Sequence, residues 1–277
     1  MTINEALRTA ATVLEETSDT PRLDAELLMA EALGVSRSDL LLRHTGDVAP
    51  ASFAALLERR RAHEPIAYIL GHQEFFGLEF RVSPAVLIPR GDSEVVVEAA
   101  LAARPDAGRV LDCGTGSGAL LLTVLHRLPL AQGVGIDRSP EALAMAQGNA
   151  ERLHLADRAR MIAADWDQPD WIEPLGGAFD LILANPPYVE DAAPLAPSVH
   201  AHEPHGALFA GPEGLDAYRV LIPQLPALLT PGGVAVLEIG ATQAAAVAAI
   251  AAEAGFAHRL HRDLGGRPRV VELSQQQ

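Results

Sequence analysis

Short apolar runs alternate with helical stretches from residue 92 onward, and this alternation constrains the fold more than any other feature of the chain. The apolar runs include residues 109–113, 133–136 and 179–184, and residues 119–127 have helical spacing. Strands that alternate with helices predict an α/β fold with a doubly wound, mainly parallel sheet. Ligands bind at the carboxyl ends of the strands in such sheets, so we expect functional residues directly after the apolar runs.

The first 90 residues follow a different pattern. Helical spacing dominates residues 3–62, and residues 74–82 form an aromatic-rich pair of short strands around Gly77. The chain is therefore predicted to have three parts, which are an N-terminal helical domain at 1–65 for partner recognition, a linking β-hairpin at 66–90 and a catalytic domain at 91–277. Arg59, Arg60 and Arg61 end the last helix of the first part, and we interpret them as a solvated helix end, since cations favour that end of the helix dipole.

A glycine-rich loop follows the strand at 109–113 and precedes the helix at 119–127. Glycines let the backbone turn tightly and let a ligand approach it, and the N–H groups that open the next helix can bind an anion. Asp137 lies 19 residues after Gly118, at the end of another strand, where a carboxylate can bind both ribose hydroxyls. The sequence therefore predicts a nucleotide cofactor, although the loop alone does not distinguish S-adenosylmethionine from NAD.

The tetrapeptide Asn185-Pro186-Pro187-Tyr188 directly follows the strand at 179–184. Two prolines stiffen the backbone here, so the Asn185 side-chain oxygen and the Pro186 carbonyl become fixed acceptors. Two acceptors can hold both N–H groups of an amide or an aromatic amine and turn the remaining electron density toward a methyl donor. Tyr188 can then stack on the planar substrate. We interpret the tetrapeptide as a nitrogen-methylating site, with an ordinary loop after a buried strand as the alternative.

The charge balance argues against extensive contact with phosphate. Lys and Arg number 21 against 36 Asp and Glu, which gives a net charge of −15 and favours a protein or small-molecule substrate over duplex nucleic acid. The single cysteine, Cys113, excludes an internal disulfide and a cysteine metal cluster. The N-terminus lacks the pattern of a signal peptide, and no stretch is apolar enough to span a bilayer. We therefore expect a cytoplasmic protein.

Other catalytic chemistries find less support in the sequence. His200, His202 and His205 gather around Glu203, and a loop face near the substrate entrance is favoured over a metal site for them. No G-x-S-x-G frame surrounds Ser117, so a serine nucleophile is not indicated. Methylation acidifies the substrate nitrogen, so its proton can pass to water or a nearby acceptor without a strong general base. We expect no metal cofactor.

Together these motifs resemble the release factor glutamine N5-methyltransferases of the PrmC/HemK family, and the resemblance extends over nearly the whole chain. The glycine loop and the tetrapeptide are shared with many adenine-N6 and guanine-N2 methyltransferases, whereas Glu64–Gly71 and Val86–Arg90 point to this family in particular. The other segments that carry the resemblance are Phe75–Leu78, Asp112–Gly118, Glu203-Pro204, Ala207-Leu208, Gly214–Arg219 and Leu237–Gly240.

The resemblance implies a Rossmann-like, class I S-adenosylmethionine-dependent fold and methylation of the glutamine in the Gly-Gly-Gln motif of class I peptide chain release factors. Asn185, Pro186, Pro187 and Tyr188 would bind that glutamine, with Asn185 also close to the cofactor. Asp112 would receive the cofactor ammonium and Asp137 its ribose. The other cofactor residues implied are Gly114, Thr115, Gly116, Ser117, Gly118, Asp165 and Trp166. From the residues alone, Trp166 fits a core aromatic equally well.

One departure from the family stands out, because Arg90 is followed by Gly91 where relatives usually carry proline. Ser93 can still cap the helix that begins there, with Glu94 available to it, so we expect activity to be retained. Two alternatives to the release factor enzyme stay open, which are a nucleic-acid amine methyltransferase and a noncatalytic adaptor. We expect a monomer without a nucleic-acid or membrane partner.

Overall fold

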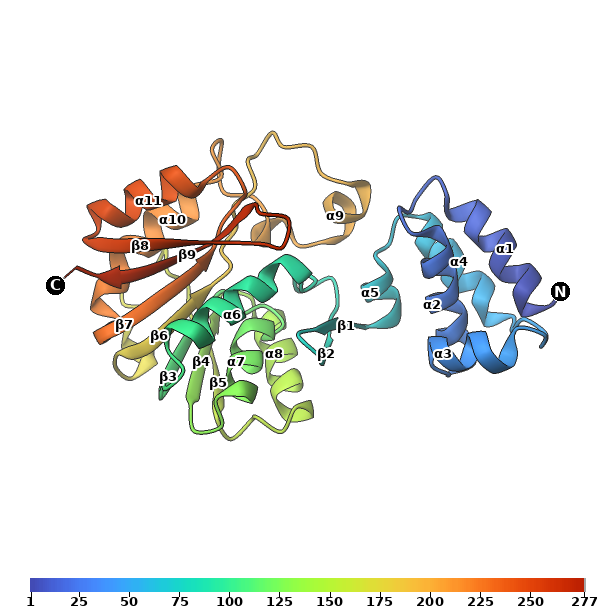
Figure 1. Cartoon of the computed structure of the whole chain (residues 1–277), viewed down its shortest axis with the longest axis horizontal. Helices are drawn as coiled ribbons and strands as arrows, with labels where there is room; N and C mark the ends of the chain where they lie inside the picture. The colour runs from blue at the N-terminus through green and yellow to red at the C-terminus, as the bar shows by residue number, and fades with distance from the viewer. Residues whose placement is uncertain (277) are drawn as a thin grey trace. The chain divides into compact units, whose positions relative to one another are not determined.

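The structure of the protein is a computed structural model, and it describes residues 1–276. Two compact units are present (Figure 1). The first, called here the helical unit, comprises Met1–His72 together with Leu195–Glu203. The second, the sheet unit, comprises Gln73–Pro194 and the chain from Pro204 onward. Within residues 1–276, no helix combines the length and the hydropathy that a membrane span needs.

The helical unit has local signals at its helix ends. Thr2 and Glu5 form a capping box that starts the first helix, and Pro21 occupies the first turn of the second, which ends at Gly34 in the left-handed conformation. Its elements are α1 (Ile3–Leu14), α2 (Pro21–Leu33), α3 (Arg37–Asp39), η1 (Leu40–His44), α4 (Ser52–Arg61), α5 (Ile66–Leu70) and α9 (Pro197–His202).

Arg60 corrects one expectation about this unit. The arginine is 8% exposed, and its Nε donates to the Asp24 carboxylate at 2.7 Å while Nη2 donates to the Thr17 carbonyl at 2.8 Å. A buried guanidinium is tolerated because its donors are satisfied by a charge and a carbonyl. Arg59 and Arg61 do reach the surface and pair with Glu64 and Glu58. Only two of the three arginines therefore form the solvated helix end that the sequence predicted.

The hairpin consists of β1 (His72–Phe75) and β2 (Leu78–Arg81), and its turn falls at Phe76 and Gly77, as expected. The stretch from 66 differs from the prediction, because α5 occupies Ile66–Leu70 and belongs to the helical unit. Gly71, with φ of 77°, ends that helix. A five-residue helix is too short to give a readable periodicity, which explains why the sequence pattern did not separate it from the hairpin.

The sheet unit is built on seven strands in the order β5-β4-β3-β6-β7-β9-β8. The first five in this order are parallel, and at one edge β9 pairs antiparallel with both β7 and β8, which confirms the predicted mainly parallel α/β sheet. The strands are β3 (Arg109–Cys113), β4 (Gln132–Asp137), β5 (Ala159–Ala163), β6 (Phe179–Ala184), β7 (Leu229–Glu238), β8 (Phe256–Arg262) and β9 (Pro268–Gln275).

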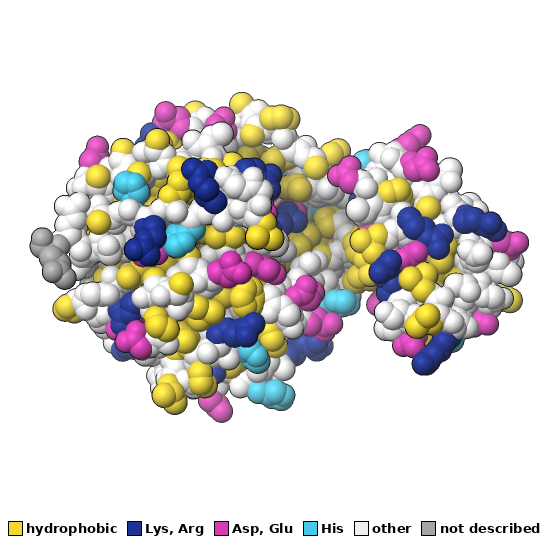
Figure 2. Space-filling view, viewed as in Figure 1, with side chains coloured by type: hydrophobic (Ala, Val, Ile, Leu, Met, Phe, Trp, Pro, Cys, Tyr) yellow, Lys and Arg dark blue, Asp and Glu magenta, His cyan; other side chains and the backbone are white. Residues whose placement is uncertain are grey.

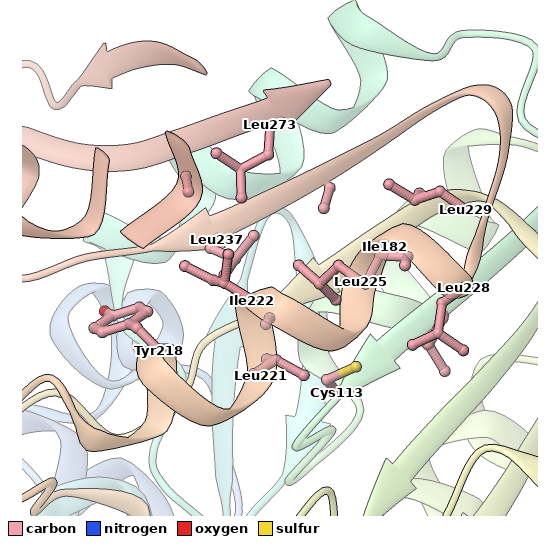
Figure 3. Close-up of a cluster of buried hydrophobic side chains, with 14 of the residues drawn as sticks. Cys113, Ile182, Tyr218, Leu221, Ile222, Leu225, Leu228, Leu229, Leu237 and Leu273 are labelled. Carbon is pink, nitrogen blue, oxygen red and sulfur yellow. The ribbon is translucent and has the colours of Figure 1, made fainter. Parts of the chain in front are cut away.

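Helices cover both faces of this sheet (Figure 1). One face packs against α6 (Glu94–Ala103), α7 (Ala119–Arg127) and α8 (Pro140–Arg152). The other packs against α10 (Asp216–Leu221), η5 (Ile222–Ala227) and α11 (Ala244–Glu253). Figure 3 shows side chains of α10 and η5 against Cys113, Ile182 and Leu237 of the strands. Cys113 is fully buried in this layer, which agrees with a packing role.

The register aligns the strand ends that carry the motifs. Cys113 at the end of β3 pairs with Ile136 of β4 on one side and with Ala184 of β6 on the other. The chain proceeds outward from β3 to β4 and β5, and then returns to place β6 on the opposite side of β3. This reversal of direction is the topological switch point where open α/β sheets bind ligands. The glycine loop and the tetrapeptide therefore emerge side by side at that point.

Candidate functional site

A cavity of about 440 Å³ lies at the carboxyl ends of β3, β4 and β6, and every lining residue belongs to the sheet unit. It brings together most of the residues singled out in the sequence. Those on its wall are Asp112, Gly114, Thr115, Gly116, Ser117, Asp137, Asp165, Trp166, Asn185 and Pro187. Gly118, Pro186 and Tyr188 are not on the wall, although each lies in one of the two motifs.

The glycine loop approaches the cavity through its main chain. Gly114 and Gly116 have φ of 76° and 54°, a left-handed conformation that favours glycine. A Cβ atom at Gly114 would lie 3.3 Å from the Trp166 ring, whereas one at Gly116 would enter open space. The Gly114 and Thr115 N–H groups both donate to the Ile136 carbonyl, which ties the loop to the end of β4. The loop is therefore a fixed wall rather than a loose connection.

Asp112 is the buried charge of the cavity. Only 1% of it is exposed, and the Thr115 hydroxyl donates to Oδ2 at 2.7 Å. In the described chain, residues 1–276, Oδ1 has no hydrogen-bond partner. Burial raises the pKa of Asp112 to about 7, an effect that the Thr115 hydroxyl opposes. A buried acceptor with an open oxygen fits the ammonium group of an amino-acid-bearing cofactor.

Asp137 occupies the expected place at the end of β4. Its Oδ2 accepts the Gly116 N–H at 3.0 Å, and Oδ1 accepts the Ser139 N–H at 2.9 Å, so the carboxylate joins the glycine loop to the start of α8. Trp166 lies on the wall next to Gly114, as the cofactor interpretation requires. Asp165 lies beside it and accepts the Asp167 N–H through Oδ1. These residues line one continuous cavity that suits a nucleoside.

The tetrapeptide is held at both ends. Asn185 lies on the cavity wall, and its Nδ2 is 3.5 Å from the Ser93 hydroxyl. At the far end, the Tyr188 hydroxyl donates to Oε1 of Glu238 at 3.1 Å, and the Tyr188 carbonyl accepts the Gln243 side-chain N–H at 2.9 Å. A Cβ atom at Gly214 would collide with that same carbonyl. Tyr188 thus acts in this structure as an anchor of the loop, because its hydroxyl bonds to the end of β7 and its carbonyl to the residue that precedes α11.

Ser93 differs from its predicted role as a helix cap. The serine ends a short 3-10 turn, η2 (Gly91–Ser93), has helical dihedral angles and makes no capping hydrogen bond to α6. Its side chain lies on the cavity wall instead. Glu94, which was expected to support the start of this helix, contacts the hairpin: its Oε1 accepts the Phe76 N–H at 3.0 Å and so stabilises the hairpin turn.

Several wall residues were not predicted from the sequence as site residues. Arg90 lines the cavity after the segment Val86–Arg90, which carried the family resemblance but no assigned function. Arg138 follows Asp137 directly and donates to the Gly206 carbonyl at 3.0 Å, across the cavity wall. Phe209, three residues after Gly206, also lies on the cavity wall. Position next to a recognised motif was the only available signal for these residues.

The three histidines after the tetrapeptide are divided between the two units. His200 and His202 belong to the helical unit, where Nε2 of His202 lies 3.2 Å from the Ala62 carbonyl. His205 belongs to the sheet unit and packs edge-on against Phe209 at 5.5 Å. Among residues 1–276, no three His, Cys, Asp or Glu side chains are grouped so that they could hold a metal ion.

The sheet order, the glycine loop and the acidic residues at the ends of β3 and β4 define a class I S-adenosylmethionine-dependent methyltransferase. Comparisons with known proteins narrow this class. Residues 5–71 match the family model of the PrmC N-terminal domain, and residues 105–261 match a methyltransferase domain. The chain belongs to the release factor glutamine methyltransferase family.

Curated relatives match over almost their whole length. The release factor glutamine methyltransferase of Moorella thermoacetica is 44% identical over 97% of this chain and 97% of its own. That of Geobacter sulfurreducens is 43% identical over 93% of this chain and 90% of its own. Among solved structures, a ribosomal protein L11 methylase from Lactobacillus delbrueckii subsp. bulgaricus has a TM-score of 0.52 at 21% identity and covers 74% of this chain and 90% of its own. At that identity the structural likeness concerns the fold.

Proposed function

We propose that this protein transfers a methyl group from S-adenosylmethionine to the side-chain amide nitrogen of the glutamine in the Gly-Gly-Gln motif of class I peptide chain release factors. The observation that carries the proposal is the placement of Asn185 beside the glycine loop, through the pairing of β6 with β3. Family membership supports the same substrate, since the curated relatives are named for it.

In this proposal the tetrapeptide binds and orients the amide. Asn185 Oδ1 and the Pro186 carbonyl each accept one N–H, while Pro187 supplies an apolar wall. Tyr188 remains a proposed contact of the glutamine, and its anchored hydroxyl limits how far the loop can move. An amide nitrogen is a weak nucleophile because its lone pair is delocalised, so fixing its orientation is the main contribution that these residues make. The nitrogen proton that is lost passes to water or a nearby acceptor.

The cofactor residues have separate proposed tasks. The open Oδ1 of Asp112 receives an ammonium group, Asp137 binds ribose hydroxyls, and Trp166 packs on an adenine with Asp165 beside it. Gly114 to Gly118 let the cofactor approach the main chain. When bound, S-adenosylmethionine supplies an electrophilic methyl group. The residues fit this cofactor because the cavity combines a buried carboxylate with an apolar aromatic wall.

We also propose that the helical unit recognises the body of the release factor. The protein is proposed to act in the cytoplasm as a monomer, without a nucleic-acid partner. A glutamine at the tip of a loop has to enter a recessed cavity, so the remainder of the partner needs a second binding surface. The net charge of −15 supports a protein partner over RNA or DNA. Acidic and arginine side chains are interspersed over the face shown in Figure 2, which fits this choice.

A labelling experiment tests the function. The protein is incubated with methyl-labelled S-adenosylmethionine and one acceptor at a time, namely a release factor, its Gly-Gly-Gln to Gly-Gly-Ala variant, or nucleic acid. We expect label in the release factor and none in the variant. Label in nucleic acid would identify an amine methyltransferase instead, and cofactor binding without any transfer would identify an adaptor.

A further inference from the structure

A buried carboxylate lies beneath the tetrapeptide and is not part of the cavity wall. Glu238 ends β7 and is 1% exposed. In the sheet register, its neighbour Leu237 pairs with Ala184, so Glu238 lies beside the residue that follows, Asn185. In the described residues 1–276, Oε2 of Glu238 has no hydrogen-bond partner. A buried carboxylate with an unused oxygen is costly, so its retention at this place calls for a function.

Glu238 connects the two ends of the tetrapeptide. Oε1 accepts the Tyr188 hydroxyl at 3.1 Å, and the nearby Ser93 hydroxyl lowers the pKa of Glu238, as a donor directed at the carboxyl group would. Ser93 in turn lies 3.5 Å from Nδ2 of Asn185. A continuous path therefore runs from Asn185 through Ser93 and Glu238 to Tyr188. Its residues come from η2, from the tetrapeptide that follows β6, and from β7, which are far apart in the sequence.

The direction of each hydrogen bond in this path follows from the chemistry of a carboxylate. An ionised carboxylate only accepts, so both the Ser93 and Tyr188 hydroxyl protons have to point at Glu238. The Ser93 oxygen then presents lone pairs to Asn185, and only the Nδ2 end of the amide can donate to them. The opposite end, Oδ1, is thereby turned away from Ser93. With Asn185 on the cavity wall, that end is the one available to a substrate N–H.

We propose that Glu238 is a positioning residue that acts through Ser93 to hold the Asn185 amide with its oxygen toward the substrate. This inference rests on the proposed function and extends it. A flipped Asn185 would present a donor to the N–H groups of the glutamine, and the two donors would repel. The negative charge of Glu238 therefore selects the orientation of a side chain that it does not touch.

The charge state of Glu238 follows from all the groups around it. Burial raises its pKa, and Asp92 on η2 adds to this effect, whereas the Ser93 and Tyr188 hydrogen bonds and Arg269 on β9 oppose it. The Tyr218 hydroxyl on α10 donates to the Glu238 main-chain carbonyl at 2.8 Å. Protonated Glu238 could donate to Ser93 and release the constraint on Asn185. The turnover number is therefore expected to fall as the pH drops through this raised pKa, since only the ionised form holds the amide.

Two variants test the proposal, Glu238→Gln and Ser93→Ala. The glutamine has the shape of Glu238 but carries a donor, and the alanine removes the relay. For each, kcat is expected to fall by about 10-fold to 100-fold, as for a misoriented catalytic group, while KM for the release factor and the dissociation constant of S-adenosylmethionine stay within about twofold of wild type. Ser93→Thr, which keeps the hydroxyl, is expected to restore most of kcat.

The double variant distinguishes positioning from general damage. If both residues act on Asn185 through one path, Glu238→Gln with Ser93→Ala loses no more activity than either single variant. Losses that multiply would overturn the proposal. Glu272→Gln on the adjacent β9 serves as control, because that carboxylate is also poorly exposed but pairs with His261 and Arg259. The low-pH decline of kcat should persist in this control and disappear in Ser93→Ala.

The outcomes separate this proposal from the function on which it rests. If wild-type protein transfers no label to a release factor, the proposed function fails whatever the variants do. If wild type is active and Ser93→Ala keeps full kcat, only the positioning role fails. Thermal unfolding is measured for each variant, and should Glu238→Gln not fold, Ser93→Ala and Ser93→Thr alone decide the outcome, because they leave the buried charge in place.

Discussion

The Asp112 carboxylate, on the cavity wall, accepts the Thr115 hydroxyl through Oδ2 at 2.7 Å, while its buried Oδ1 has no hydrogen-bond partner among residues 1–276. Its pKa of about 7 means that the carboxyl is partly protonated near neutral pH. A cofactor ammonium stabilises the ionised form, so binding should release protons from Asp112. The carboxyl therefore couples cofactor affinity to pH within the range in which the protein would work.

The affinity for S-adenosylmethionine should consequently weaken as the pH falls from about 7.5 to 5.5, approaching tenfold per pH unit below the pKa of the free site. Calorimetry in buffers with different ionisation enthalpies measures the proton release directly. In Asp112→Asn the affinity should be lower and independent of pH over this range. An affinity that does not vary with pH in wild type would contradict the assignment of Asp112 as the ammonium site.

The same raised pKa predicts a gain in stability for Asp112→Asn without cofactor. The folded pKa lies above the unfolded value of 3.8, so folding disfavours ionisation, and the cost grows as the pH rises from the unfolded to the folded pKa. Above about pH 7 the cost is complete. The melting temperature of Asp112→Asn should exceed that of wild type by several degrees at pH 8, and the difference should vanish near pH 4. Scanning calorimetry at the two pH values checks this.

Asn185→Ala tests the acceptor on the substrate side. The variant should bind S-adenosylmethionine within about twofold of wild type and lose about 100-fold or more in kcat, since one of two amide acceptors is gone. Equilibrium binding and steady-state labelling of the release factor give the two quantities. Normal turnover in Asn185→Ala would refute the proposed role.

Local patterns predicted the parts of this molecule that depend on neighbours in sequence. The strand at 179–184, the helix at 119–127 and the placement of Asp137 at the end of β4 all follow from apolar runs and glycines. Trp166 was equally compatible with a core position, and only the folded chain places it beside Gly114. Its place depends on how the chain after β5 folds back over the glycine loop, which no local pattern encodes.

The contacts of Ser93, Tyr188 and Arg60 could not be predicted for the same reason. Tyr188 reaches Glu238, which is 50 residues away in the chain, because β6 and β7 are adjacent in the sheet. Ser93 meets Asn185 across a separation of 92 residues. Helix-cap and helix-end rules read only a few neighbouring positions, so they assigned Ser93 to a cap and Arg60 to solvent. Tertiary partners decided both positions.

Gly91→Pro should stabilise the protein by about 0.4–1 kcal/mol and leave activity unchanged. Arg90 already has φ of −105° and ψ of 144°, the extended conformation that a following proline requires, and Gly91 starts the 3-10 turn. A Cβ atom at Gly91 would meet no heavy atom within 4 Å. Urea unfolding measures the stability and the labelling assay measures the activity. Gly91→Ala is expected to give a smaller increase in stability than Gly91→Pro. A loss of stability would show that this turn needs the freedom of glycine.

The helical unit offers exposed apolar side chains for the proposed contact with the release factor. Leu42 and Val48 are each 80% exposed, and residue 48 forms an isolated β-bridge with Thr2 at the start of α1. Replacing both with serine should raise KM for the release factor about tenfold or more, because apolar contact area is lost, while kcat and cofactor affinity stay unchanged. Leu264→Ser in the sheet unit, where the leucine is fully exposed, provides the matched control. If KM for the Gly-Gly-Gln-bearing release factor is the same in the double variant and in Leu264→Ser, partner recognition lies elsewhere on the molecule.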